Sequence, residues 1–211
     1  MTTDENEPVG NETAVDARHA EKMRKKKAAR DKILAGKTIE KGLLIVHTGK
    51  GKGKSTAAFG MVMRSIGHGM KVGVVQFVKG AWNTGERAVL ENFPDLCTIM
   101  AMGEGFTWET QDRQRDIDHA RAGWEEAKRM LADPNYRMVL LDELNIVLRY
   151  DYLPLDEIVA ALQNRPPGKH VIVTGRNASD RLIEIADLVT EMELVKHPFR
   201  SGVKAQAGIE F

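Results

Sequence analysis

One segment limits what this chain can fold into more than any other: glycines and lysines alternate directly after a short apolar run. It reads His47-Thr48-Gly49-Lys50-Gly51-Lys52-Gly53-Lys54-Ser55-Thr56. The preceding run, Leu43–Val46, indicates a strand buried on both faces. The following residues, Ser55–Ser65, indicate a helix that ends near Gly67 and Gly69. A buried strand, a glycine-rich turn and a helix in this order are typical of a phosphate-binding loop, or P-loop.

The residue types of this loop suit a polyphosphate. Glycines let backbone N–H groups turn toward an anion, and the helix N-terminus adds a partial positive charge. Lys54 offers a cation to phosphate oxygens, and the Ser55 hydroxyl is a candidate Mg²⁺ ligand. The strict motif has glycine five positions before Gly53, where this chain has Thr48, so we expect an altered path around the phosphates. The alternative is a glycine-rich turn with solvated lysines. The candidate nucleotide-binding residues here are Thr48, Gly49, Lys50, Gly51, Lys52, Gly53, Lys54, Ser55 and Thr56.

A second segment supports the same interpretation. Met138–Leu141 is apolar and runs into Asp142 and Glu143. Ligands of open α/β sheets bind at the carboxyl ends of the strands, and carboxylates there can hold Mg²⁺. The alternative is that both acids are solvated and cap the next helix.

The rest of the chain alternates between strand and helix patterns. Strands are predicted over 72–78, 96–100, 137–141, 170–174 and 188–194, and helices over 110–132, 154–163 and 178–186. This alternation predicts an α/β fold with a mostly parallel sheet flanked by helices on both faces.

Composition narrows the class further. The chain has 211 residues, a net charge of +1 and one cysteine, Cys97, which fits a reducing compartment and excludes an internal disulfide framework. No apolar run reaches the roughly 20 residues of a membrane span, and the N-terminus lacks a signal-peptide pattern. We therefore expect a cytoplasmic protein.

The N-terminal segment differs from the rest of the chain. Residues 1–16 are polar and acidic and are expected to be disordered. Residues 17–36 are rich in lysine, arginine and helix formers, so a basic helix is expected within an arm that reaches residue 41. The main domain then covers 42–211. The basic run could be a solvated face, a nucleic-acid contact or a cover for a ligand.

Glycine, lysine and acid indicate only a nucleotide, so the aromatic segment Gly103–Thr110 carries more information about function. Phe106 and Trp108 lie there between glycines and a predicted helix, and they fit no core period. They form either a hydrophobic staple at the helix start or a wall for a large flat ligand. Physical reasoning alone favours neither.

The chain resembles the ATP:cob(I)alamin, or corrinoid, adenosyltransferases of the CobA/CobO/BtuR family. The resemblance covers residues 42–211 in family order. The matching stretches are TGKGKGKSTAAFG (48–60), VGVVQFVKG (72–80), GEGFTWET (103–110), RMLADP (129–134), LLDE (140–143), YDYLPL (150–155), VTGR (173–176) and GVKAQAG (202–208). GKGKS alone would be weak, but with GFTWET and VKAQ the match is highly specific.

The resemblance implies transfer of the 5′-deoxyadenosyl group of ATP to Co(I) of a reduced corrinoid, such as cob(I)alamin, with release of triphosphate. It also implies a P-loop RecA-like fold, a homodimer, reversed ATP in the loop, Mg²⁺ or Mn²⁺, and an electron donor such as reduced flavodoxin or a flavin reductase. Neither a nucleic-acid nor a membrane partner is expected.

Residue roles follow from the resemblance together with the chemistry. Lys52 and Lys54 would stabilise the triphosphate, Lys54 being assigned a catalytic role. Ser55 and Glu143, with Asp142, would hold the metal. Arg176, Lys204 and Gln206 are further nucleotide-binding candidates. Phe106 and Trp108, also assigned as catalytic, would lie against the lower axial face of the corrin, displace the axial ligand and so ease reduction of Co(II).

Two other functions compete with this one. The first is a P-loop ATPase or phosphotransferase acting on a small molecule. The second is a nucleic-acid ATPase that uses the basic arm, against which the near-zero net charge argues. The choice among cobalamin, cobinamide and cobyrinic acid diamide as the preferred corrinoid stays open.

Overall fold

The computed structural model describes residues 9–78, 84–102 and 112–210, with side chains described from residue 14 onward. The chain divides into two compact units, residues 1–40 and residues 41–211. The predicted aromatic wall, including Phe106 and Trp108, lies outside the described residues.

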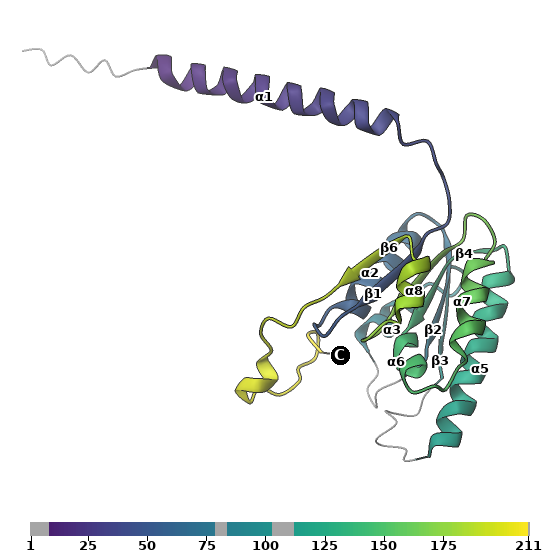
Figure 1. The fold of residues 1–211 in the computed structure, drawn as a ribbon. Coiled ribbons are helices and arrows are strands. Elements are labelled where there is room, and N and C mark those ends of the chain that lie inside the picture. Colours follow the sequence, from purple (N-terminus) through teal and green to yellow (C-terminus); the bar gives the residue numbers. More distant parts are fainter. Residues whose placement is uncertain (1–8, 79–83, 103–111, 211) are drawn as a thin grey trace, which may run out of the picture. The chain divides into compact units, whose positions relative to one another are not determined.

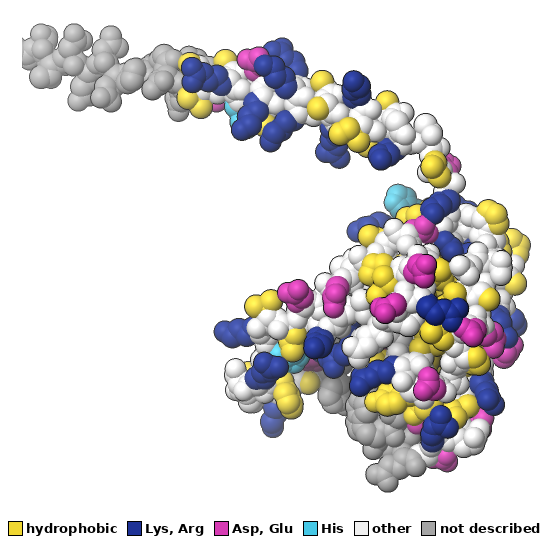
Figure 2. All heavy atoms as spheres, in the orientation of Figure 1, with side chains coloured by type: hydrophobic (Ala, Val, Ile, Leu, Met, Phe, Trp, Pro, Cys, Tyr) yellow, Lys and Arg dark blue, Asp and Glu magenta, His cyan; other side chains and the backbone are white. Residues whose placement is uncertain are grey.

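The first unit contains one helix, α1, Val9–Ala35. Its described side chains are exposed, and Figure 2 shows Lys and Arg side chains distributed along it. The helix ends where the sequence predicts but begins at Val9, so it includes residues 9–16 that were expected to be disordered. Once a helix is nucleated, each added residue costs little, and the helix formers from residue 17 onward provide that nucleus.

The second unit is built around a six-stranded sheet in the order β3-β2-β4-β5-β1-β6 (Figure 1). The strands are β1 Leu44–Thr48, β2 Lys71–Gln76, β3 Cys97–Ala101, β4 Tyr136–Asp142, β5 His170–Thr174 and β6 Leu188–Glu191. Every neighbouring pair is parallel. All strands therefore end at the same edge, where the P-loop follows β1.

Helices cover both faces of this sheet. They are α2 Lys54–Gly67, α3 Gly85–Leu90, α5 Arg113–Ala132, α6 Leu144–Arg149, α7 Leu155–Gln163 and α8 Asp180–Ile185. Alternate strand residues enter separate cores. Leu44 and Val46 of β1 pack with α5, α6, α7 and α8, whereas Ile45 packs with α2 and α3. The predicted α/β fold with helices on both faces is confirmed.

A few elements differ from the prediction. The last strand ends at Glu191 rather than Leu194, and helices α3 and α6 were not predicted. Neither was the 3₁₀ turn Pro198–Ser201. Each of these helices has only six residues, too few to display a helical period. None of the helices in the described ranges is both long enough and apolar enough to cross a membrane.

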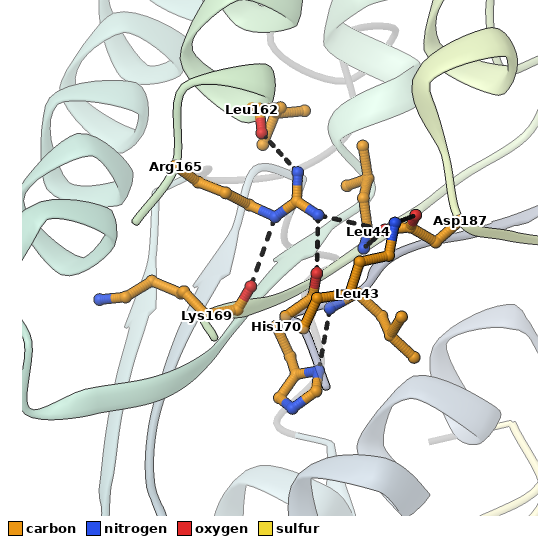
Figure 3. Close-up of polar contacts among 9 residues, drawn as sticks. Leu43, Leu44, Leu162, Arg165, Lys169, His170 and Asp187 are labelled. Carbon is orange, nitrogen blue, oxygen red and sulfur yellow. Dashed lines mark hydrogen bonds and ion pairs between the residues drawn. The ribbon is translucent and has the colours of Figure 1, made fainter. Parts of the chain in front are cut away.

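Polar contacts fix the beginning of β1, at the opposite edge from the P-loop (Figure 3). The Leu43 amide donates to His170 Nδ1 at 3.1 Å, and the Leu44 amide donates to Asp187 Oδ2 at 2.9 Å. The Arg165 guanidinium donates to the carbonyls of Leu162, Lys169 and Gly42 and to Asp187. These hydrogen bonds connect the beginning of β1 to residues next to β5 and β6, and so hold β1 in its place between them.

Candidate phosphate-binding site

The P-loop has the backbone conformations that its glycines predict. Gly49 and Gly53 have φ of 95° and 102°, in the left-handed region that favours glycine. Gly53 is the N-cap of α2 and makes no side-chain cap hydrogen bond. The first-turn N–H groups of α2 therefore remain available to an anion.

Two of the glycines also serve a packing role that the sequence did not reveal. A Cβ on Gly49 would lie 2.4 Å from the Met192 carbonyl oxygen, and one on Gly51 would lie 2.5 Å from the Glu193 carbonyl oxygen. The Gly51 amide donates to the Met192 carbonyl at 2.6 Å, and the Met192 amide donates to the Thr48 carbonyl at 2.9 Å. The segment after β6 thus lies directly against the P-loop.

Lys54 is the buried cation of the site. Its side chain is 6% exposed, and its Nζ donates to the Gly51 carbonyl. Burial lowers the pKa of Lys54; Glu143 opposes this shift, whereas Arg176 and Lys52 reinforce it. A desolvated cation beside further cations favours an added anion such as phosphate.

Asp142 is the buried anion at the end of β4. It is 4% exposed, and its Oδ1 accepts from the Thr174 hydroxyl at 2.7 Å. Its Oδ2 accepts from Gln76 Nε2 at 3.3 Å. Burial raises the pKa of Asp142, whereas hydrogen bonds from Thr174, Ser55 and Gln76 lower it. The structure thus brings Ser55 and Asp142 together, although they are far apart in the sequence.

Glu143 follows in a backbone conformation that is unusual for its residue type. Its φ is 58°, and it is the N-cap of α6. Burial and the adjacent Asp142 raise the pKa of Glu143 to about 7, while Lys54 and Arg176 oppose the shift. Lys54, Arg176 and the two acids therefore lie within one electrostatic environment, in which burial disfavours the charged forms of Lys54, Asp142 and Glu143.

This donor set fits Mg²⁺ held jointly with a polyphosphate. The described residues contain no group of three or more His, Cys, Asp or Glu side chains that could hold a metal by themselves. Mg²⁺ prefers hard oxygen ligands and commonly takes one or two carboxylates while substrate phosphates and water complete its shell. Ser55, Asp142 and Glu143 supply one hydroxyl and two carboxylates, which are the hard oxygen ligands that Mg²⁺ prefers.

Other predicted residues occupy varied positions. Thr48 is buried, and its hydroxyl accepts from the Ala178 amide at 3.0 Å, so this side chain holds the loop to the segment after β5. Lys52 is exposed and pairs with Glu210. The remaining predicted nucleotide contacts, Lys50, Thr56, Arg176, Lys204 and Gln206, are exposed.

The ion pair between Lys52 and Glu210 brings the end of the described chain to the P-loop. The Lys52 ammonium lowers the pKa of Glu210 through their hydrogen bond. This contact was not predicted, because neither residue carries a local signal for a partner 158 positions away.

A separate hollow of about 620 Å³ lies at the amino ends of β1, β5 and β6, bordered by Lys41, Arg165, Arg181 and Asp187 among others. Its cations already have partners. Lys41 and Arg165 pair with Asp187, and Arg181 pairs with Asp156. We assign no ligand to it.

Comparison with known proteins connects this geometry to one group of enzymes. A family model described as "ATP:corrinoid adenosyltransferase BtuR/CobO/CobP" matches residues 40–211. A second, described as "Cob(I)alamin adenosyltransferase N terminal", matches residues 2–34.

Curated relatives agree along nearly the whole chain. A corrinoid adenosyltransferase of Sinorhizobium sp is 63% identical over 198 residues, covering 93% of this chain and 92% of its own. One of Pseudomonas aeruginosa is 58% identical over 196 residues, covering 93% and 97%. One of Escherichia coli K12 is 50% identical over 196 residues, covering 93% and 99%.

Proposed function

This chain belongs to the ATP:corrinoid adenosyltransferase family, and we propose that it transfers the 5′-deoxyadenosyl group of ATP to Co(I) of a reduced corrinoid. The observation that carries the proposal is that Lys54, which is buried at the start of α2, lies close to the two acids at the end of β4, Asp142 and Glu143. This site combines an anion cradle with a place for a divalent cation, within a chain that matches the family from end to end.

The reaction is an alkylation. The electron pair of Co(I) attacks the 5′ carbon of the ribose, a Co–C bond forms, and the bond from this carbon to the triphosphate oxygen breaks. The electron pair of the broken bond leaves on triphosphate, cobalt becomes formally Co(III), and no proton is transferred. The step requires alignment of the two substrates and stabilisation of the leaving triphosphate.

The residues of the P-loop supply that stabilisation. The open N–H groups of the first turn of α2 and the Lys54 ammonium face the polyphosphate, and exposed Lys52 adds charge once Glu210 releases it. Arg176, which lies in the same electrostatic environment as Lys54, contacts the phosphates or the ribose. Lys204 and Gln206 cover the nucleotide.

Mg²⁺ is the divalent cation we propose for the site. Ser55, Asp142 and Glu143 would hold it, and when bound it neutralises charge on the triphosphate. Mn²⁺, which prefers similar oxygen ligands, is a second candidate.

The corrin face of the site stays a proposal based on the family. Phe106 and Trp108 would line it, displace the lower axial ligand and ease reduction of Co(II) by a donor such as reduced flavodoxin. Phe106→Ala and Trp108→Ala should then lose activity with Co(II) and the donor but retain it with pre-reduced Co(I). Equal activity with both cobalt states, at the wild-type level, would refute this role.

We also propose a cytoplasmic homodimer. The exposure of all four residues of edge strand β6, including Leu188 and Val189, supports a partner surface there. Light scattering on a sizing column should give twice the monomer mass, and a monomer at micromolar concentration would contradict it.

The decisive experiment is anaerobic incubation with MgATP and chemically reduced cob(I)alamin. Loss of the Co(I) absorption band, a light-sensitive alkylcobalamin and released triphosphate are expected. Appearance of ADP and phosphate with Co(I) unchanged would instead establish a P-loop ATPase or phosphotransferase. Repeating the assay with cobinamide and cobyrinic acid diamide identifies the preferred corrinoid.

A further inference from the structure

We propose that Thr174 and Asn145 are positioning residues that tie the turn after β4 to the end of β5 and thereby hold Glu143 beside Lys54. The inference builds on the proposed function, since it concerns how the ATP site of that reaction is kept in shape. Neither residue was predicted to take part in nucleotide binding. Thr174 lies within VTGR (173–176), one of the stretches that resemble the family.

Thr174 joins the two strand ends through a single hydroxyl. It is fully buried as the last residue of β5. The hydroxyl donates to Asp142 Oδ1 at 2.7 Å and accepts from the Glu143 amide at 2.8 Å. One hydroxyl thus fixes the carboxylate of the first acid and the backbone of the second. Among uncharged side chains of this size, only serine and threonine can both donate and accept in this way.

Asn145 makes the second connection from the other side of the turn. It is 1% exposed, and its Nδ2 donates to the Gly175 carbonyl at 3.0 Å. A Cβ on Gly175 would lie 2.9 Å from Asn145 Cβ and 3.1 Å from Glu143 Oε2. The backbone after β5 and the turn after β4 therefore touch directly, and Gly175, with φ of 125°, makes the approach possible.

The orientation of the Asn145 amide leaves one group unsatisfied. Asn145 Oδ1 is the one buried side-chain nitrogen or oxygen, among the described residues, that has no hydrogen-bond partner. Such atoms are rare in folded proteins because an unpaired buried acceptor is destabilising.

Glu143 needs this support for two reasons. Its φ of 58° is unfavourable for a residue with a Cβ, and such conformations persist only where the surroundings enforce them. It also follows Asp142 directly, so two carboxylates share a buried place and repel each other. Without the ties to β5, the turn can relax and withdraw the Glu143 carboxylate from Lys54.

Thr174→Val tests the first tie, because valine has nearly the same shape and lacks the hydroxyl. The readout is the dissociation constant of MgATP, measured by calorimetry on the full chain, together with KM, kcat and the unfolding temperature. We expect Thr174→Val to weaken MgATP binding at least about tenfold, as loss of one hydrogen bond to a carboxylate and one from a backbone amide implies. Thr174→Ser, which keeps the hydroxyl, should bind nearly as wild type does.

Thr98→Val is the matched control, because the Thr98 hydroxyl accepts from the Tyr136 hydroxyl at 2.9 Å on β3, at the far edge of the sheet from β5. It should leave the dissociation constant unchanged. The proposal fails if Thr174→Val binds MgATP as wild type does. It also fails if Thr174→Ser loses as much affinity as Thr174→Val, since the hydroxyl would then not be the cause.

Asn145→Ala tests the second tie. It should weaken MgATP binding in the same direction, and the double variant with Thr174→Val should lose less than the product of the two single effects, because both act through one turn. Independent, multiplicative effects would overturn the shared role. Wild-type binding of MgATP without any adenosylation would refute the proposed function while leaving this inference open to the same binding tests.

Discussion

Lys54 shows at the scale of one residue how the site is prepared for an anion. Its charge is buried, and burial together with Arg176 and Lys52 lowers its pKa. Within the protein, only Glu143 opposes that shift among the causes that act on it. A bound triphosphate would add negative charge beside Lys54 and so stabilise the charged form of its side chain.

Lys54→Met should therefore abolish most activity while leaving the fold intact. Methionine fills a similar volume without the charge, so adenosylation should fall by about 10²-fold or more, as for removal of other groups that stabilise developing negative charge. Steady-state kinetics with cob(I)alamin measure the loss. Lys71→Met is the control, because Lys71 lies at the start of β2, where its ammonium stands 5.0 Å from the centre of the Tyr136 ring. Comparable losses in both variants would contradict the assignment.

Glu143 predicts a dependence of stability on pH. Its pKa in the folded protein is about 7, above the ordinary value of 4.5. Between these values the unfolded chain ionises first, so the free energy of unfolding falls as pH rises from about 4.5 to about 7, by roughly 3 kcal/mol at most. Below that window the carboxyl is protonated in both states and the penalty is absent.

Glu143→Gln should remove this contribution. We compare the free energy of unfolding of the nucleotide-free variant with that of wild type, measured by urea unfolding at pH 5 and at pH 7.5. The difference in favour of the variant should be larger at pH 7.5. A stability difference that stays constant between the two pH values would show that Glu143 is not held in this buried state.

Within single elements, substitution of a P-loop glycine should affect nucleotide binding more than the stability of the fold. Gly51→Ala would place a methyl group 2.5 Å from the Glu193 carbonyl oxygen, so the loop must shift. We expect a loss of MgATP affinity of at least tenfold, measured by calorimetry, with a smaller effect on the unfolding temperature.

Gly60→Ala is the matched control in α2. A Cβ there meets no atom within 4 Å, and the position is exposed. Alanine should stabilise the helix by about 0.5–1 kcal/mol without changing nucleotide affinity. If both variants bound MgATP equally well, the contact between the loop and the segment after β6 would not matter for binding.

The elements also show which features can be predicted from sequence. Strand β5 was predicted with its observed bounds, because the apolar, β-branched run Val171–Val173 marks a buried strand, and its residues alternate between the two cores. The phosphate loop and its acids were identified from local order along the chain. The contacts of Thr174, Asn145, Met192 and Glu210 were not, because each depends on a partner distant in sequence. The short helices α3 and α6 were missed, since six residues show no helical period.

For the molecule as a whole, the two units pose a question about the basic arm. Residues 41–211 form a compact unit with hydrophobic cores of their own, so they should fold without the arm. Deleting residues 1–36 should leave the unfolding temperature nearly unchanged, and it should raise the KM for the corrinoid if the basic arm is a cover for that substrate. Assays of both proteins with cob(I)alamin measure this. An unchanged KM would indicate that the basic arm is a solvated face and does not cover the corrinoid.

The order of strands has a consequence for how the protein is made. The strand that carries the phosphate loop leaves the ribosome before β2, β3 and β4, whereas its neighbours β5 and β6 follow them. Leu43 must wait for His170, 127 positions later, before its amide finds its partner. During translation the apolar strand β1 therefore has two open edges, which favours aggregation and slow closure of the sheet. The phosphate loop is held in place only once β5 and β6 have paired with β1. ATP should therefore stabilise chains that include β5 and β6, but not nascent chains that still lack them.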